Sequence, residues 1–328
     1  MSDATYVLPL RWQDTTASAE MTEYLRWLSG YLHIVVVDGS PSEVYEHHSG
    51  QWSAYVKHIP PDPSLTFMNG KVNGVTTGIR YAETDAIIVA DDDIRLDATS
   101  IERILQALRN HDVVIAQSYF DPTPWHAQWD EARILLNRAF GVHFPAALGL
   151  RRSLFIDVGG YDGDVLFENL ELIRSMQFGG GRIARPNDLF VRHLAPERHA
   201  FWSQRVRQAY DDFTLPVRMG LWLSLLPMTL VALRRRSFGS ILAAGVAVTV
   251  IAEIGRRRGG GSRVYPATAS LFAPLWLAER ALCSWGAVWY RVRKGGVPYR
   301  DGVIERAATP PKELRLRIQE RVRHVPER

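Results

Sequence analysis

Three consecutive aspartates, Asp91–Asp93, are the residues whose type and spacing point most directly to chemistry. They follow the apolar segment Asp85–Ala90, which is predicted to be a buried strand. At a strand end, residues two apart point the same way, so Asp91 and Asp93 can project together. Adjacent carboxylates repel one another unless a cation neutralises them, and Mg²⁺ or Mn²⁺ with diphosphate oxygens does so. The alternative is a solvated acidic turn that caps a helix beginning near Ala98.

Strands and helices alternate around these aspartates. Strands are expected at Thr5–Leu10, His33–Val37, Asp85–Ala90 and Val113–Gln117, and helices at Ser18–Ser29, Asn73–Glu83 and Ala98–Asn110. This alternation predicts an α/β fold with a largely parallel sheet. Because polar residues just past the carboxyl ends of parallel strands line the ligand crevice, Asp38 and Asp91–Asp93 are expected on one functional edge.

The composition excludes several classes of protein. A chain of 328 residues with 46% hydrophobic and 23% charged residues can bury a substantial core. Cys283 alone cannot form an internal disulfide or a cysteine-built zinc site. Met1–Trp12 lacks the basic start and long apolar run of a cleavable signal, so none is expected.

The net charge of +4 conceals an asymmetry. Residues up to Val217 include 19 basic and 28 acidic side chains, a balance of −9, and the remainder has 20 and 7, a balance of +13. A basic half suits nucleic acid or an anionic membrane surface. The basic residues flank apolar segments and no recognition motif accompanies them, so we expect a membrane and no nucleic acid as partner.

Two apolar segments, Leu215–Leu233 and Phe238–Ile254, are each followed by an arginine triplet, Arg234–Arg236 and Arg256–Arg258. They are at the short limit for crossing about 30 Å of hydrocarbon, which takes about 20 residues. Since both triplets flank the second segment, positive charge does not orient it, and a shallow hairpin is favoured. The alternative is a soluble helical subdomain.

A third apolar segment, Val264–Tyr290, carries Glu279 and Arg280 in its middle. Two charges make a lipid-exposed span expensive, so this segment is expected to lie in the interface or to pack on other helices. The tail from Arg291 holds 11 basic and 5 acidic residues and is predicted to form a surface-seeking helix.

Short segments spread along the chain resemble, in order, the motifs of one enzyme family. They are Val35–Ser40, Asn69–Asn73, Ala90–Arg95, Gly159–Asp162 with Glu168–Leu172, and Gln204–Gln208. Over roughly Thr5 to Phe213 the chain resembles the family 2 glycosyltransferases with a GT-A fold, especially their membrane-bound branch of ceramide glucosyltransferase-like enzymes.

The resemblance implies a role for each matching residue. Asp38 would hold the uracil or ribose of a nucleotide-sugar donor, and Lys71 would approach its diphosphate. Asp91 and Asp93 would bind the divalent cation, Mg²⁺ or Mn²⁺. Gln204 and Arg207 would lie near donor and acceptor, and Arg207 suits diphosphate because its planar fork pairs two oxygens. His193 would be a further metal ligand, as in some GT-A enzymes, or else a structural histidine.

The sequence departs from the family pattern at Asn169, where the family has the aspartate that serves as base. An asparagine cannot accept a proton at neutral pH. Glu168 or Glu171 must substitute, or the protein is inactive. If the stretch is helical, these two glutamates are i, i+3 neighbours, and their proximity would raise the pKa of one of them. The alternative is that Glu171 merely faces solvent.

A second departure is Gln208, which replaces the tryptophan that would stack on an acceptor sugar. Trp202 or Tyr210 could take over the stacking, and a non-sugar acceptor would make it unnecessary.

The sequence thus predicts a membrane-associated glycosyltransferase. It would use a UDP-linked donor and a lipid or membrane-delivered acceptor, with inversion and with the catalytic domain on the cytoplasmic face. The alternative is a catalytically silent scaffold or sugar-nucleotide-binding partner. The expected divisions are a GT-A domain, membrane-associated helices and a basic tail, at residues 1–213, 214–290 and 291–328.

Overall fold

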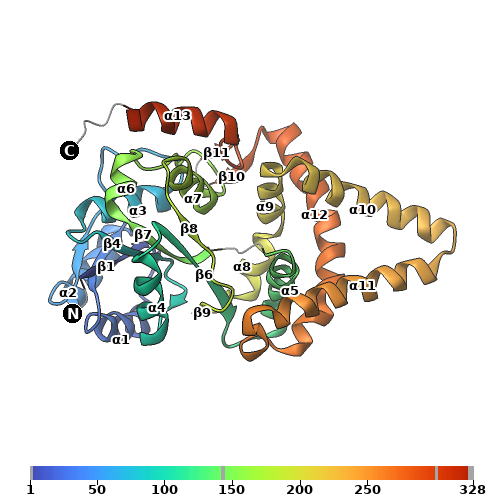
Figure 1. Cartoon of the computed structure of the whole chain (residues 1–328), viewed down its shortest axis with the longest axis horizontal. Coiled ribbons are helices and arrows are strands. Elements are labelled where there is room, and N and C mark those ends of the chain that lie inside the picture. The colour runs from blue at the N-terminus through green and yellow to red at the C-terminus, as the bar shows by residue number, and fades with distance from the viewer. Residues whose placement is uncertain (1–2, 142–144, 300–301, 324–328) are drawn as a thin grey trace. The chain divides into compact units, whose positions relative to one another are not determined.

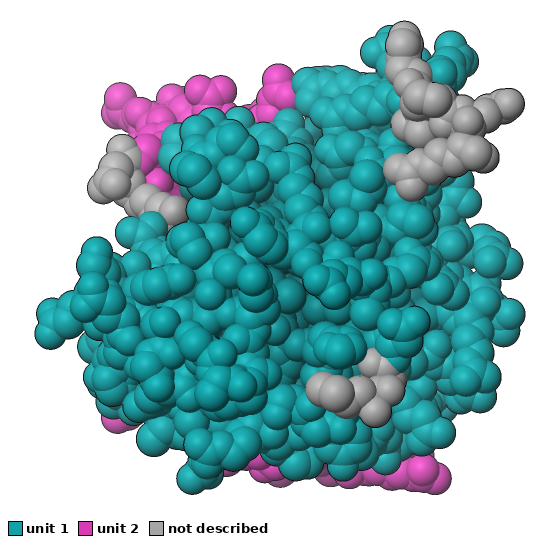
Figure 2. Space-filling view, turned by 90° about the vertical axis from the view of Figure 1, so that its left-hand side faces the viewer, with its two compact units in different colours: residues 1–117, 145–191, 309–328 teal, residues 118–144, 192–308 magenta. Residues whose placement is uncertain are grey.

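The computed structural model describes residues 3–141, 145–299 and 302–323. The chain divides into two compact units, each discontinuous in sequence. Figure 1 shows the helices and strands of the chain, and Figure 2 shows the two units in different colours. Unit 1 comprises residues 1–117, 145–191 and 309–328, and unit 2 comprises residues 118–144 and 192–308. This division differs from a boundary at residue 213, because two segments of the predicted GT-A domain belong to unit 2.

A mostly parallel sheet is the centre of the fold. Its strands are β1 (Ala4–Leu10), β2 (His33–Asp38), β3 (Lys57–Ile59), β4 (Ala86–Ala90), β5 (Ile94–Arg95), β6 (Val113–Phe120), β7 (Pro145–Arg151), β8 (Ile183–Ala184) and β9 (Phe190–His193). The order is β3-β2-β1-β4-β7-β6-β9-β5, with β8 beside β6. Strands β3, β2, β1 and β4 run parallel, and β7 is antiparallel to β4 and β6. The predicted α/β fold with a largely parallel sheet is confirmed.

Helices cover both faces of this sheet in unit 1. They are α1 (Ser18–Leu28), α2 (Ser42–Trp52), α3 (Gly70–Tyr81), α4 (Ala98–Leu108), α6 (Arg152–Asp157), α7 (Glu168–Phe178) and α13 (Pro311–Arg323). A hydrophobic core lies on each face of the sheet, and alternate residues of β1 belong to different cores. Tyr6 and Leu8 pack with α1, α2 and α4, whereas Val7 packs with α3, α6, α7 and α13. The period of two along a strand produces this three-layer arrangement.

The basic tail contributes a helix to unit 1. Leu314 and Ile318 of α13, four residues apart on one helix face, are buried in the same core as Leu172 of α7. The remaining face of α13 is largely polar, which matches the surface helix expected from the composition. Its apolar stripe nevertheless makes this helix part of the core of unit 1.

Unit 2 is mainly helical. Its elements are α5 (Trp125–Ala139), α8 (Arg198–Ser203), α9 (Arg205–Tyr210), α10 (Pro216–Arg234), α11 (Phe238–Arg257), α12 (Ala273–Lys294), the 3₁₀ segments η1 (Asp211–Thr214), η2 (Arg258–Arg263) and η3 (Ala267–Phe272), and the hairpin of β10 (Val297–Tyr299) and β11 (Gly302–Ile304). Helix α11 packs on α5, where the buried Arg138 donates from Nε to the carbonyl of Gly255 at 3.1 Å and from Nη2 to that of Arg258. These bonds satisfy carbonyls at the C-terminal end of α11 that lack helical partners.

Helices α10 and α11 form a hairpin joined by residues 235–237, visible in Figure 1. Both are long and apolar enough to cross a membrane, and large apolar side chains such as Met228 (64% exposed) and Leu242 (70%) lie on their surface. Helix α12 packs on α5, α9 and α10, and its Glu279 and Arg280 are buried. The two charges in the third apolar segment therefore face protein.

Glycine 78 sets the distance between α3 and β1. A Cβ added at Gly78 would lie 2.4 Å from Cγ1 of Val7, whereas one added at Gly50 of α2 would meet nothing within 4 Å. We expect Gly78→Ala to lower the free energy of unfolding by about 1–3 kcal/mol through overpacking. Gly50→Ala, the matched control, should raise it by roughly 0.5–1 kcal/mol through helix propensity. Chemical denaturation checks both, and equal effects of the two substitutions would contradict this account of the packing.

Candidate active site

Lys71 joins two of the predicted carboxylates in unit 1. Its Nζ lies 2.8 Å from Oδ1 of Asp91 and 2.8 Å from Oε1 of Glu168. Lys71 is in the first turn of α3, Asp91 follows β4, and Glu168 begins α7. Burial lowers the pKa of Lys71, but the carboxylates of Asp91 and Glu168 outweigh it and hold the pKa well above its ordinary value. The lysine is therefore a fixed positive charge.

Asn69 fixes where α3 begins and thereby positions Lys71. The buried Asn69 side chain accepts a hydrogen bond from the backbone N–H of Lys71 at 3.1 Å, as an N-cap. The helix therefore starts at Gly70, three residues before the predicted Asn73, and Lys71 lies in its first turn.

The environment of Asp91 concentrates negative charge. Burial raises the pKa of Asp91, Lys71 opposes the shift, and repulsion from Asp93 and Glu168 adds to it. Three carboxylates thus act on one another at this point. Oxygen ligands of this kind suit Mg²⁺ or Mn²⁺, and a divalent cation would relieve the repulsion. The donor set therefore fits the predicted cation.

The capping alternative for the triplet does not hold. The N-cap of α4 is Asp97, whose side chain accepts from the backbone N–H of Ser100 at 2.7 Å in a capping box. The middle aspartate, Asp92, instead accepts a hydrogen bond from the indole N–H of Trp12. Burial raises the pKa of Asp92, which this bond partly offsets.

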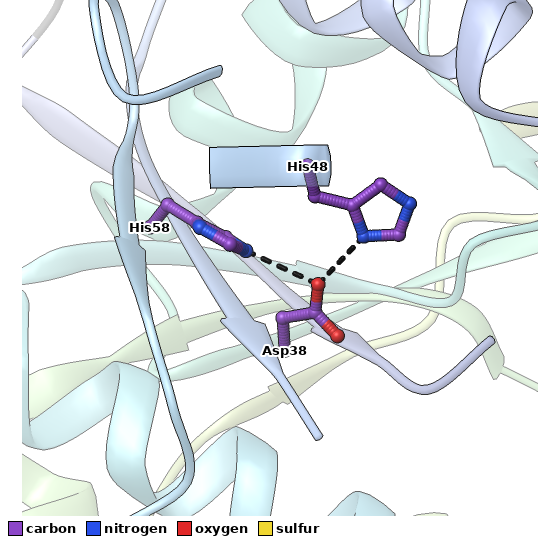
Figure 3. A group of neighbouring side chains, drawn as sticks. All are labelled: Asp38, His48 and His58. Carbon is purple, nitrogen blue, oxygen red and sulfur yellow. Dashed lines mark hydrogen bonds and ion pairs between the residues drawn. The ribbon is translucent and has the colours of Figure 1, made fainter. Parts of the chain in front are cut away.

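Asp38, at the end of β2, is the centre of a buried group shown in Figure 3. Its Oδ2 lies 2.7 Å from Nδ1 of His48 and 3.1 Å from Nε2 of His58, and its Oδ1 accepts from the backbone N–H of Ser40 at 2.9 Å. The residue is 1% exposed. Burial raises the pKa of Asp38, but the bonds from His58, Ser40 and His48 bring it down to about 2.

The two histidines were missed by sequence reasoning. Val44, His48 and Trp52 recur every four residues along the buried face of α2, a helix the sequence analysis did not place. This spacing is the signal that could have found His48. The ring of Trp52 stacks on His48 at 4.2 Å between centroids, and Tyr45 stacks on His58 at 4.4 Å.

The ligand atoms of Asp38, His48 and His58 all lie within 4.8 Å of one another, so the three side chains could hold one metal ion. Two imidazoles and a carboxylate suit zinc and similar metals better than Mg²⁺. The distances of 2.7 and 3.1 Å from the Asp38 carboxylate to the two imidazoles are those of hydrogen bonds.

Glu171 makes a different contact from Glu168. Although Glu168 and Glu171 share the first turn of α7, Glu171 is fully buried and its Oε2 accepts from the backbone N–H of Thr309 at 2.9 Å. Burial raises the pKa of Glu171, and the bonds from Thr309 partly offset this. The structure thus excludes a solvent-facing Glu171 and gives it a contact with the chain leading into α13.

The remaining predicted residues belong to unit 2. The guanidinium of Arg207 in α9 lies 5.0 Å from the ring centroid of Tyr299, and Gln204 is exposed at the junction of α8 and α9. His193, at the end of β9, packs its ring 4.6 Å from that of Phe120. Arg205 is buried and pairs with Asp130 at 3.0 Å, so of the two neighbouring arginines Arg207 is the more accessible.

The sequence from residue 33 to residue 161 matches the model of glycosyl transferase family 2. This part, under half of the chain, contains Asp38, Lys71 and Asp91–Asp93 and ends before Glu168. No curated protein sequence matches the chain.

Among solved structures, the mannosyltransferase PcManGT from Pyrobaculum calidifontis, in complex with GDP-mannose and Mn²⁺, matches with a TM-score of 0.56 and 15% identity, covering 86% of this chain and 87% of that one. Mannosyl-3-phosphoglycerate synthase from Rubrobacter xylanophilus has a TM-score of 0.40 at 14% identity, covering 61% and 69%. The first of these likenesses confirms the predicted GT-A fold. With the family match, it supports the prediction of a glycosyltransferase.

The low pKa of Asp38 makes a testable contribution to stability. An acid whose folded-state pKa, about 2, is below its unfolded value stabilises the fold above the unfolded pKa, near 3.8, and loses that contribution as the pH falls toward 2. Asp38→Asn should lower the free energy of unfolding at pH 7 by up to about 2 kcal/mol. The difference from wild type should shrink below pH 4. Denaturant titrations across pH check this, and a difference that grows on acidification would contradict it.

Proposed function

We propose that this protein is a membrane-associated, metal-dependent glycosyltransferase. It moves a sugar from a nucleotide-linked donor, UDP-linked in our proposal, to a lipid or membrane-delivered acceptor with inversion at the anomeric carbon. The group of Lys71, Asp91 and Glu168 carries the proposal. The cationic Lys71 contacts both carboxylates, of which Asp91 can ligate a cation and Glu168 can accept a proton.

The chemistry assigned to the chain is a direct displacement. The oxygen of the acceptor hydroxyl bonds to the anomeric carbon while Glu168 accepts the hydroxyl proton. The bond from that carbon to the diphosphate breaks, and its electrons stay on the diphosphate leaving group. Lys71 stabilises the negative charge that develops there. A divalent cation held by Asp91 and Asp93 would supply further charge neutralisation when bound.

The residues of unit 2 complete the proposal. Arg207 and Gln204 would contact the donor or acceptor, since their spacing matches the family motif, and His193 would add a ligand to the cation. Asp38 would bind the nucleoside, and its hydrogen bonds to His48 and His58 would hold it ionised for that purpose. Placement in the ceramide glucosyltransferase-like branch is likewise part of the proposal.

Asn169 keeps a second function open, that of a silent sugar-nucleotide-binding scaffold. Hydrolysis or transfer assays with Mn²⁺, using a panel of UDP-sugars and GDP-mannose, separate the two functions. Release of nucleotide by the wild-type chain supports the enzyme, and donor binding without any release supports the scaffold.

The two glutamates of α7 give the sharpest test of the mechanism. We expect Glu168→Gln to lower the turnover by about 10²–10⁴-fold, because the amide cannot accept the proton. Glu171→Gln, buried at Thr309, should keep turnover within a few-fold of wild type and serves as the matched control. Undiminished turnover in Glu168→Gln would exclude Glu168 as the base.

Asp93→Ala should abolish the dependence on added Mn²⁺ together with transfer, without changing the circular dichroism spectrum.

The membrane part of the proposal is supported by α10 and α11. Their exposed apolar surface and flanking arginines suit an anionic bilayer, and the catalytic unit would then face the cytoplasm.

Charges placed on the hairpin should release the protein from membranes. We expect Met228→Glu combined with Leu242→Glu to shift the full-length chain from the membrane pellet toward the soluble fraction, since a charge buried in lipid is expensive. The matched control is Leu316→Glu on α13, a leucine that is 61% exposed outside the hairpin. Sedimentation and carbonate extraction measure the distribution, and a wild-type chain that does not sediment with membranes would refute membrane association.

A further inference from the structure

The group of Asp38, His48 and His58 is built by one strand–helix–strand unit. Asp38 ends β2, His48 lies in α2 and His58 lies in β3. Strand β3 pairs with β2 in parallel, with His58 opposite Val36, so α2 is the crossover between two neighbouring strands. The three side chains are entirely buried. Regular elements, and no long loop, therefore hold these three side chains together.

Both imidazoles direct a nitrogen atom to the same carboxylate oxygen, as Figure 3 shows. Nδ1 of His48 lies 2.7 Å and Nε2 of His58 lies 3.1 Å from Oδ2 of Asp38, and the three atoms are all within 4.8 Å of one another. Because Zn–N and Zn–O bonds are about 2.0 Å long, the ligand atoms of a tetrahedral zinc ion are about 3.3 Å apart. The two nitrogen–oxygen separations thus have to open by less than about 1 Å. The ion takes the place of the N–H protons between these atoms, so no larger cavity is required.

The charge of this group favours a cation. Asp38 is 1% exposed, and among the residues that the structure describes its ion pairs are with the two histidines alone. No lysine or arginine there neutralises the buried carboxylate, so the positive charge comes either from protonation of a histidine or from a bound cation. A divalent ion supplies it while both imidazoles stay neutral, which is the form that ligates metals.

Neighbouring groups fix the orientation of two of the three ligands. Nε2 of His48 lies 3.1 Å from Oγ of the buried Ser18, and Oδ1 of Asp38 accepts from the backbone N–H of Ser40 at 2.9 Å. In metal sites the histidine nitrogen that does not bind the ion usually donates to a neighbouring acceptor, and ligating carboxylates are themselves hydrogen-bonded. Nδ1 of His48 and Oδ2 of Asp38 are therefore the atoms presented to an ion.

The ligand types separate this group from the aspartate triplet. Asp91 and Asp93 offer only oxygen atoms, which suit Mg²⁺ or Mn²⁺, whereas two imidazole nitrogens with one carboxylate suit Zn²⁺. Trp12 contacts both groups, because its indole N–H donates to Asp92 and its ring meets that of His48 edge to face at 5.4 Å between centroids. Unit 1 thus has two neighbouring groups with different metal preferences.

We propose that Asp38, His48 and His58 bind a zinc ion that fixes the end of β2, with a fourth ligand from solvent. The ring of Tyr45, stacked 4.4 Å from that of His58, belongs to a half-buried residue, so a single side chain separates the site from solvent. The ion uses Oδ2 of Asp38, whereas Oδ1 remains for Ser40 and for the proposed nucleoside. Zinc binding is therefore independent of whether the protein transfers sugar.

The test measures Zn²⁺ binding to the full-length, chelator-treated protein without a polyhistidine tag, by competition with a chromophoric chelator in excess Mg²⁺. We expect the wild type to bind Zn²⁺ that Mg²⁺ does not displace. His48→Phe and His58→Phe keep an aromatic ring in place and remove the ligating nitrogen, so each should weaken Zn²⁺ binding at least about hundredfold. His47→Gln is the matched control, since this exposed histidine of α2 bonds to Gln51, and it should bind Zn²⁺ as the wild type does.

Unchanged Zn²⁺ binding in His48→Phe and His58→Phe would overturn the proposal, as would an equal loss in His47→Gln. Displacement of Zn²⁺ by Mg²⁺ would assign the ion to the aspartate triplet and overturn the site. If the phenylalanine variants fail to fold, Co²⁺ bound to the wild type decides, because the site predicts the visible absorption of a four-coordinate ion and a six-coordinate spectrum contradicts it. Binding of a UDP-sugar with Mn²⁺ to the same preparation distinguishes failure of the zinc site from failure of the proposed function.

Discussion

The pairing of Lys71 with Asp91 and Glu168 is the interaction on which the organisation of unit 1 depends. A half-buried ammonium is costly unless it is paired. Here the lysine comes from α3, and its partners come from the end of β4 and the start of α7. Three elements distant in sequence are therefore held at one point by charge. The same pairing leaves the aspartate triplet with an excess of negative charge, which is the condition for holding a cation.

Unit 2 solves a different electrostatic problem. Two of its helices, α10 and α11, are long and apolar enough to cross a membrane. Elsewhere in this unit arginines are buried with acidic partners, as in the pair of Arg205 on α9 and Asp130 on α5. Charges of this kind are tolerated inside a helical bundle only when other groups satisfy them. The two units thus place their charges differently: unit 1 gathers carboxylates around Lys71, and unit 2 pairs buried arginines with acidic side chains inside a helical bundle.

Much of the fold could be predicted from local patterns, because strand and helix periods are recorded in consecutive residues. The strands before Asp38 and Asp91 and the helix after Asp97 are found within a residue or two of their predicted bounds. The short strand β3 and the helix α2 were not predicted, since three residues carry too little periodicity and α2 is weakly amphipathic. The division into units could not be predicted either, because each unit is built from segments that are far apart in the sequence and pack in the same core.

The sequence alone determined the fold class, the acidic triplet behind a buried strand, Lys71 in its motif and the apolar segments with their arginines. These are properties of residue type and short spacing. Only the tertiary structure decided which carboxylates meet. Glu168 and Glu171 are three residues apart on one helix turn, yet one contacts Lys71 and the other a backbone N–H near the C-terminal helix, because different elements pack against each. The tertiary structure likewise placed two histidines on Asp38 and gathered Arg218 with Arg280, since contacts between residues distant along the chain have no local signature.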